Sequence, residues 1–194
     1  MRIPLEEKTV EIFVKKSRFI AIAKPIASVT QIKENITATR NEHPHAAHVV
    51  HAAVVGKKGD QFSYSDDQEP KNSAGRPAFE VLKGSGITNI LVMIIRYFGG
   101  TLLGTGGLVR AYSDATREVL QVLKTEKLIE KSSLTIIIGY EFYEQAKLIL
   151  EENDATLDEK FETDVTIELT LPTINVEKVK EQIINLSNGK AIIK

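Results

Sequence analysis

Residues 90–110 read Ile-Leu-Val-Met-Ile-Ile-Arg-Tyr-Phe-Gly-Gly-Thr-Leu-Leu-Gly-Thr-Gly-Gly-Leu-Val-Arg, and this stretch decides how the first part of the chain folds. Ile87–Arg96 is apolar at successive positions, which predicts a strand buried on both faces at the centre of a sheet. After the glycines, apolar side chains recur at helical spacing from Leu108 to Val122. A strand, a glycine-rich loop and a helix in this order indicate an α/β domain.

The glycine-rich loop has five glycines in the nine positions 99–107, where the backbone can take positive φ and approach a partner closely. The start of the following helix offers free N–H groups, and Arg96 and Arg110 flank the loop, so the segment suits a phosphate or another anion. A phosphate-binding P-loop would need Lys at the position of Thr105, and a dinucleotide fingerprint would need a differently spaced third glycine. The alternative is a purely architectural turn with close packing of helix on sheet.

The rest of the N-terminal part reads as strands and helices with one long polar connection. A capping box, Ser28 with Gln31, starts one helix. A loop from Gly56 to Gly75 is expected to be functional or disordered because of its length. The remaining expected elements are strands at Lys8–Val14, Arg18–Ile26 and Ala46–Val55 and a short helix at Pro77–Lys83.

The C-terminal part has the order β-α-β-β-α-β, which is that of a ferredoxin-like domain. Strict alternation in Val165–Leu171 predicts a half-buried strand, and Asn175 is expected to cap the second helix. The other expected elements are strands at Ser132–Gly139, Ala155–Phe161 and Lys190–Lys194 and a helix at Tyr140–Asn153.

Charge supports a division into two domains, which we expect at residues 1–128 and 129–194. The whole chain has a formal net charge of −1, but residues 1–126 carry 17 basic and 13 acidic side chains, and residues 127–194 carry 8 and 13. The first part is therefore +4 and the second −5, although chance variation could also give this difference. The basic part keeps nucleic acid open as a partner.

Composition excludes several classes of protein. The chain has no Cys, so disulfides, thiolate catalysis and Cys-ligated metals are excluded. No apolar run is long enough to span a bilayer, and the first residues lack an apolar signal region. We expect a cytoplasmic protein with no membrane partner and no cofactor.

Three carboxylates, Asp66, Asp67 and Glu69, fall within four residues of the long loop. They could bind Mg²⁺ or act as acid and base, which would make the protein a metal-dependent hydrolase. The alternative is a structural role, in which they accept backbone N–H groups and pair internally with Arg76, Arg96 and Arg110.

The four histidines lie together at His43, His45, His48 and His51. His48 and His51 are three apart on the expected strand, so they face opposite sides of the sheet and do not converge on one metal. We expect no metal site, with His48 buried and the other three at the surface.

Basic and aromatic side chains of residues 1–126 are suited to backbone phosphates and to stacked bases. Core aromatics and a solvated surface are the structural alternative. The basic set is Lys15, Lys16, Arg18, Lys57, Lys58, Lys71, Arg76, Arg96, Arg110 and Arg117, and the aromatic set is Tyr64, Tyr97, Phe98 and Tyr112.

Five motifs together resemble the YigZ/IMPACT family over about residues 1–125. Two departures are Gln68, where many members have Gly, and Val49, where a second His is common. The motifs are Lys16-Ser-Arg-Phe-Ile-Ala21, the His43–His48 segment, Ser65-Asp-Asp-x-Glu69-Pro70, Ala74-Gly-Arg-Pro77, and Arg96-Tyr-Phe-Gly-Gly100 continued by Leu103-Gly-Thr-Gly-Gly-Leu-Val-Arg-Ala-Tyr112.

The resemblance implies an N-terminal domain like the second domain of ribosomal protein S5 and a small ferredoxin-like C-terminal domain, an α+β protein in two domains. It also implies a link to translation, since eukaryotic relatives are tied to translational control through protein contacts. Some bacterial members carry a dipeptidase label, but no nucleophile–base pair is identifiable in this sequence.

Three functions therefore remain open. The leading one is a non-enzymatic translation-related regulator that binds RNA or the ribosome; the others are a protein-binding regulatory module and a hydrolase that uses the acidic loop. The expected nucleic-acid or anion site comprises Lys16, Arg18, Arg76, Arg96, Gly99, Gly100, Gly104, Thr105, Gly106, Gly107 and Arg110.

Overall fold

The computed structural model describes all 194 residues, and they form two compact units, residues 1–128 and 129–194. Each unit has its own sheet, its own helices and its own hydrophobic core. The expected class, an α+β protein in two domains, is confirmed. None of the helices has the length and apolarity needed to cross a membrane.

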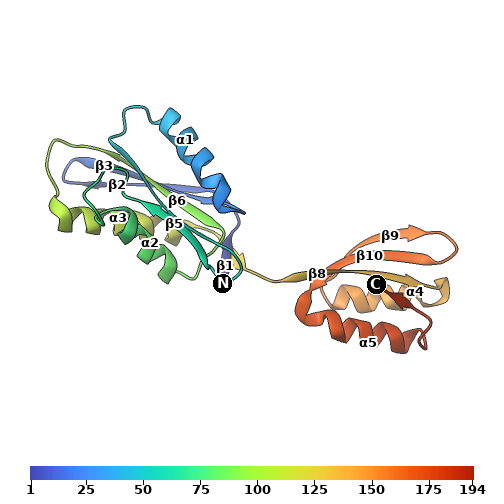
Figure 1. The fold of residues 1–194 in the computed structure, drawn as a ribbon. Coiled ribbons are helices and arrows are strands. Elements are labelled where there is room, and N and C mark those ends of the chain that lie inside the picture. Colours follow the sequence, from blue (N-terminus) through green and yellow to red (C-terminus); the bar gives the residue numbers. More distant parts are fainter. The chain divides into compact units, whose positions relative to one another are not determined.

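Unit 1 is built on a five-stranded antiparallel sheet in the order β2-β3-β6-β4-β5 (Figure 1). The expected central strand does lie in the middle of this sheet, as β6. The strands are β2 (Lys8–Val14), β3 (Ser17–Pro25), β4 (His48–Val55), β5 (Gln61–Ser65) and β6 (Ile90–Tyr97).

Helices cover both faces of this sheet (Figure 1). Helices α2 (Gly75–Gly84) and α3 (Gly104–Val122) pack on one face. Helix α1 (Ile32–Glu42), preceded by the 3-10 turn Val29–Gln31, packs on the other. Successive side chains of β6 therefore enter the cores on opposite faces of the sheet, which explains why the strand is apolar at successive positions.

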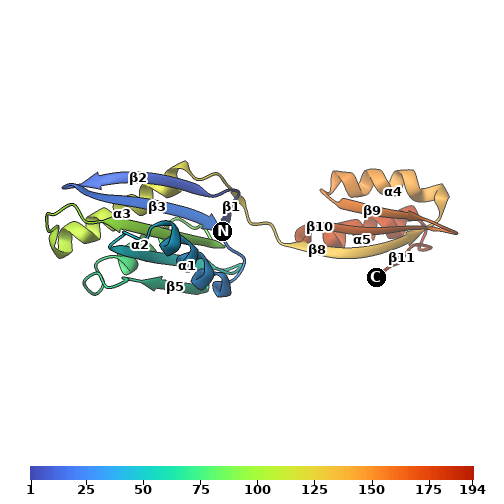
Figure 2. The same ribbon diagram turned by 90° about the horizontal axis from the view of Figure 1, so that it is seen from above.

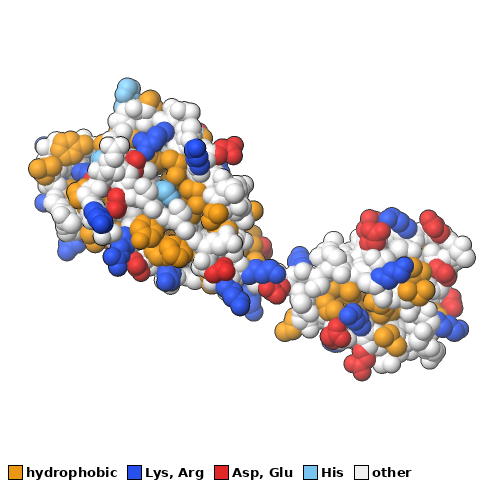
Figure 3. All heavy atoms as spheres, in the orientation of Figure 1, with side chains coloured by type: hydrophobic (Ala, Val, Ile, Leu, Met, Phe, Trp, Pro, Cys, Tyr) orange, Lys and Arg blue, Asp and Glu red, His pale blue; other side chains and the backbone are white.

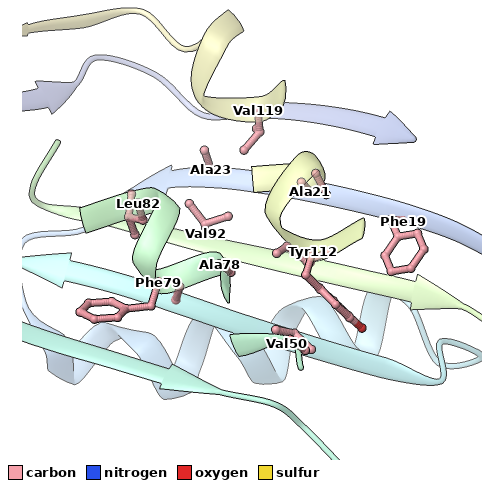
Figure 4. Packing of buried hydrophobic residues seen from close by; sticks show 14 of the residues in the cluster. Phe19, Ala21, Ala23, Val50, Ala78, Phe79, Leu82, Val92, Tyr112 and Val119 are labelled. Carbon is pink, nitrogen blue, oxygen red and sulfur yellow. The ribbon is translucent and has the colours of Figure 1, made fainter. Parts of the chain in front are cut away.

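The larger core lies between the sheet and helices α2 and α3 (Figure 4). Phe19 meets Tyr112 edge to face, with ring centroids 5.2 Å apart. Ala21, Ala23 and Ala78 are small, so the helices approach the strands closely at these positions. This packing fixes both helices against the sheet and with them the positions where each helix starts.

Two short strands, β1 (Arg2–Pro4) and β7 (Thr125–Lys127), pair antiparallel and join the two ends of unit 1.

The capping box at Ser28 and Gln31 forms as expected and leads into α1.

The region expected to be one long loop, Gly56 to Gly75, contains a strand, β5, which pairs with β4. The expectation of an unbroken loop was wrong because it was based on polarity. The five residues Gln-Phe-Ser-Tyr-Ser alternate aromatic and polar side chains, and this period of two is a strand signal.

Unit 2 has the expected β-α-β-β-α-β order, with sheet order β11-β8-β10-β9 (Figure 2) and both helices on one face (Figure 1). Asn175 lies at the expected N-cap but makes no capping bond; its amide donates to the Asn153 carbonyl instead (3.2 Å). The elements are β8 (Lys131–Ile138), α4 (Tyr140–Glu152), β9 (Thr156–Phe161), β10 (Val165–Pro172), a 3-10 turn (Thr173–Asn175), α5 (Val176–Leu186) and β11 (Ile192–Ile193).

Candidate functional site

Four connections meet at one end of the sheet of unit 1, which we call the loop end. Strand pairing places them there, because Arg18 lies opposite Tyr97, His48 opposite Arg96, and His51 opposite Ser65. The connections are the turn 15–16 and the segments 43–47, 66–74 and 98–103. The acidic loop, the glycine-rich loop and most of the candidate cations therefore come together at the loop end.

The β2–β3 turn and the first glycines are fitted to each other. Lys15 and Lys16 both have positive φ (44° and 69°), as a tight hairpin turn requires. The Gly99 N–H donates to Ser17 Oγ (3.2 Å), and a Cβ on Gly99 would overlap the backbone of Lys16. Gly99 thus serves close packing, which is the architectural alternative for the glycine-rich loop.

Arg96 lies inside unit 1, where it pairs with Glu69. Both are buried, at 5% and 7% exposure, with Arg96 Nη1 2.7 Å from Glu69 Oε1. The Tyr112 hydroxyl donates to the same oxygen (2.7 Å), and His48 Nε2 lies 3.8 Å from it. Burial, followed by the charge of Glu69, raises the pKa of Tyr112 far above its usual value. Arg96 is therefore engaged in the internal pairing considered as an alternative, instead of facing an external anion.

Asp66 caps the start of α2, although it precedes the residues whose N–H groups it accepts by eight and nine positions in the sequence. Its Oδ1 accepts the N–H groups of Ala74 (3.0 Å) and Gly75 (2.8 Å), and its Oδ2 accepts that of Asn72 (2.8 Å). Gly75 has no room for a side chain because a Cβ would meet the backbone of Ser65. One carboxylate of the acidic loop thus satisfies the open N–H groups of a helix.

Asp67 fastens the acidic loop to the neighbouring strand. Its carboxylate pairs with Arg40 and accepts the Val49 N–H (2.6 Å), and its carbonyl contacts His48 Nδ1 (2.8 Å). Since Asp66 and Glu69 are also bonded to protein groups, all three carboxylates have structural partners. No group of three or more His, Asp or Glu side chains anywhere in the chain has a metal-binding arrangement.

The histidine expectation was partly wrong. His51 is buried beneath α1, and His48 is only partly buried. Burial lowers the pKa of His51, and its Nε2 lies 3.0 Å from Ser63 Oγ. This Ser–His contact depends on β5, which brings Ser63 alongside β4 and which the sequence pattern did not predict.

The start of α3 is open, unlike that of α2. Leu103 at its N-cap offers no side-chain acceptor, and the first turn has no acidic residue. Gly104 has a φ of 71°, which explains a glycine there, whereas a Cβ on Gly106 would meet nothing within 4 Å. Glycine inside a helix costs about 1 kcal/mol of stability relative to alanine. Because a side chain at Gly106 would meet nothing, internal packing does not explain why glycine occupies this position.

A cavity of about 390 Å³ lies between this helix start and the β2–β3 turn. Two exposed cations, Lys15 and Arg110, line it together with the backbone of Gly106 and Gly107. No ion pair or hydrogen bond engages Arg110 in unit 1. The remaining lining residues are Val14, Leu103, Ala111 and Asp114.

The other expected site residues lie around this cavity or away from it. Lys16 and Thr105 are exposed near it, and Gly100 takes a positive φ of 81° in the loop before α3. Arg18 is exposed, is bonded to Glu11 (2.6 and 2.8 Å) and lies over the Tyr97 ring.

Arg76 is not part of this cavity. It sits on α2, where its Nε lies 3.9 Å from Glu80, and it lines a separate groove of about 680 Å³ between α2 and α3. Lys15 belongs to the basic set but not to the expected site residues, and the hairpin turn brings it to the cavity.

Comparison with known proteins agrees with this architecture. The Impact N-terminal domain matches residues 15–120, and a domain of unknown function, DUF1949, matches residues 136–190. The chain is 33% identical to the IMPACT family member YigZ of Escherichia coli, over 96% of this chain and 93% of that protein. It is 30% identical to the IMPACT family member YvyE of Bacillus subtilis, over 95% and 85%.

A crystal structure of a hypothetical protein superposes with a TM-score of 0.70 at 32% identity, covering 99% of this chain and 95% of the other. Family matches to both units and alignment along nearly the whole length lead to one conclusion. The chain belongs to the IMPACT family.

Proposed function

We propose that this protein is a non-enzymatic regulator of translation in the cytoplasm, and that it binds structured RNA such as that of the ribosome through the cavity at the start of α3. Membership of the IMPACT family supports the link to translation. The observation that carries the binding proposal is the cavity itself, where Lys15 and Arg110 flank uncapped helix N–H groups.

The chemistry of this cavity suits a phosphate group. The first N–H groups of a helix carry partial positive charge, and they have no intrahelical partner. Two cations beside them add attraction without supplying an acceptor, and the carboxylate of Asp114, which also lines the cavity, is bonded to Arg117 (2.6 Å). A phosphate oxygen can therefore accept N–H bonds that no side chain of this helix start accepts.

Groups next to the cavity suit a polynucleotide better than a lone phosphate ion. Lys16 and Arg18 are exposed on the adjacent hairpin and can meet neighbouring phosphates. Phe98 is half exposed in the loop before α3, so its ring is available to stack on an unpaired base. These contacts read backbone and shape, so we expect little sequence preference.

The test is a titration of fluorescent structured RNA with the full chain at several salt concentrations. We expect affinity to fall steeply with salt, and Arg110→Ala to weaken binding and reduce the salt slope by about 1. Lys33→Ala is the control, because this exposed lysine lies on α1, on the other face of the sheet, and does not line the cavity. Binding that ignores salt, or equal losses from the two variants, would contradict the proposal.

Cosedimentation with ribosomal subunits addresses the link to translation. We expect the full chain to pellet with subunits at low salt and Arg110→Ala to remain in the supernatant. If instead the protein captures only partners that survive RNase treatment, the protein-binding module is the better description.

A further inference from the structure

The two edges of the sheet in unit 1 are unequal. Strand β2 forms one edge and includes the charged Lys8 and Glu11, and charges on an edge strand discourage pairing with other chains. Strand β5 forms the other edge, and its five residues Gln61–Ser65 include no charge and no proline. In Figure 2 no further element lies beyond β5 on that side of the sheet. The main-chain groups on its outer side are therefore open to another strand.

An aromatic strip runs along this open edge. Phe62 and Tyr64 are 57% and 40% exposed, although both belong to the face that packs on α2. Their rings stack on Phe79 of α2, with centroid distances of 4.9 and 5.2 Å. Figure 3 shows hydrophobic side chains gathered at the surface over β5 and α2. The strip thus leaves two large rings half covered at the edge of a sheet.

We propose that β5 pairs antiparallel with β5 of a second copy of this chain, with Ser63 at the two-fold axis. In that register Phe62 lies opposite Tyr64 of the partner subunit, and Tyr64 lies opposite Phe62 of the partner subunit. Gln61 lies opposite Ser65 of the partner subunit. Directly opposed side chains in an antiparallel pair are in contact, and aromatic pairs are among the favourable ones.

The sequence of β5 suits this partner because it is self-complementary. An antiparallel pair of identical strands brings like side chains toward each other across the axis, so any charge near the centre would repel its own copy. The centre here is a serine flanked by aromatics. Pairing would extend the sheet across both copies and join the two aromatic strips. A five-residue strand makes a small interface, so the dimer should form in a concentration-dependent way.

Charge substitutions at the opposed positions test the register directly. Sedimentation of the RNase-treated wild-type chain should shift with concentration from 21.5 kDa toward twice that mass. Phe62→Lys with Tyr64→Lys places two lysines opposite each other and should stay monomeric. Phe62→Glu with Tyr64→Lys places opposite charges there and should dimerise more than the double-lysine variant. Phe13→Lys, a substitution of an exposed aromatic on the opposite edge strand β2, is the control and should leave the dimer intact.

The outcomes separate clearly. A wild type that stays monomeric at all concentrations overturns the proposal, as does a dimer that the double-lysine variant leaves unchanged. Monomeric protein in which RNA or a peptide protects Phe62 and Tyr64 would assign the edge to that ligand instead. Comparison of two variants with equal numbers of charged substitutions keeps the test valid if both lose some stability.

Cysteine crosslinking gives a second readout, because the chain has no cysteine of its own. Opposed residues of paired strands have Cα atoms about 4.5–5.5 Å apart, within the range of a disulfide. Gln61→Cys with Ser65→Cys should therefore form a covalent dimer on mild oxidation. Neither single variant should do so, because residue 61 does not lie opposite itself in this register. Crosslinking of a single variant equal to that of the pair would overturn the register.

Discussion

Helices α2 and α3 begin at the same end of the same sheet, and both begin with glycine, yet their first turns are treated in opposite ways. The first N–H groups of α2 are accepted by the carboxylate of Asp66. Those of α3 have no side-chain acceptor, and a cavity that includes Lys15 and Arg110 in its lining lies beside Gly106 and Gly107. The chain thus supplies an anion that caps one helix, and it leaves the first turn of the other without a side-chain acceptor.

This difference distinguishes a helix start that stabilises the fold, that of α2, from one that is available for binding, that of α3. The acidic loop is adjacent to the β6–α3 connection, and its carboxylates engage α2, Arg40 and Arg96. A fourth carboxylate placed at α3 would have closed that helix start as well. Asp66 also shows the kind of ligand that the start of α3 lacks, namely an oxyanion that accepts adjacent backbone N–H groups.

The largest effect on stability should come from removal of the buried ion pair between Arg96 and Glu69 at the loop end. Arg96→Ala leaves Glu69 as an unpaired buried charge, so we expect the free energy of unfolding to fall by about 3–5 kcal/mol. Arg110→Ala, on the open side, should change it by less than about 0.5 kcal/mol. Urea unfolding of both variants measures this, and similar losses would contradict the division between the two helix starts.

Removal of the internal anion is expected to have the next largest effect. Asp66→Ala deprives the start of α2 of its acceptor and should lower the free energy of unfolding by about 1–2 kcal/mol. RNA binding should persist once the variant is folded, because the cavity at α3 is not touched. The control is Asp66→Asn, which retains one acceptor oxygen and should lose less. A loss of RNA affinity with unchanged stability would instead assign Asp66 a role in RNA binding.

Glycine substitutions sharpen the comparison further. Gly106→Ala should raise the free energy of unfolding by up to about 1 kcal/mol, because alanine favours the helix and its Cβ meets nothing. The same variant should bind RNA more weakly, because the methyl group occupies the approach to the helix start. Gly75→Ala is the counterpart on α2 and should destabilise, since its Cβ would meet the Ser65 backbone. Chemical denaturation and RNA titration of both variants give the four values required.

The smallest effect concerns pH. Burial lowers the pKa of His51 in the folded state, so the unfolded chain takes up a proton first as pH falls. The contribution of His51 to stability is fully present above about pH 6.5 and is progressively lost below it. His51→Gln should therefore flatten the decrease in melting temperature between pH 7.5 and pH 5.5. An unchanged pH profile would show that His51 is not the titrating group.

Hydrophobic periodicity predicted much of the fold, since β6 and all of the elements of unit 2 follow simple apolar patterns. Strand β5 was missed because only five residues carry its alternation, between two polar segments with turn residues of positive φ such as Asp67 and Gln68. Sequence alone left the candidate site less certain. Whether Arg96 meets an anion or Glu69 depends on the antiparallel register that brings residues 27 positions apart together.

The most direct test of the central claim is an NMR titration of the isotopically labelled full chain with inorganic phosphate, with the backbone amides as probes. The account predicts that the amides of Gly104, Gly106 and Gly107 shift progressively and that Arg110→Ala weakens the response. The amides of Gly75 and Ala74, already bonded to Asp66, should not move. If the amides of α3 stay unchanged, or those of α2 shift as much, the account of an open and a closed helix start is contradicted.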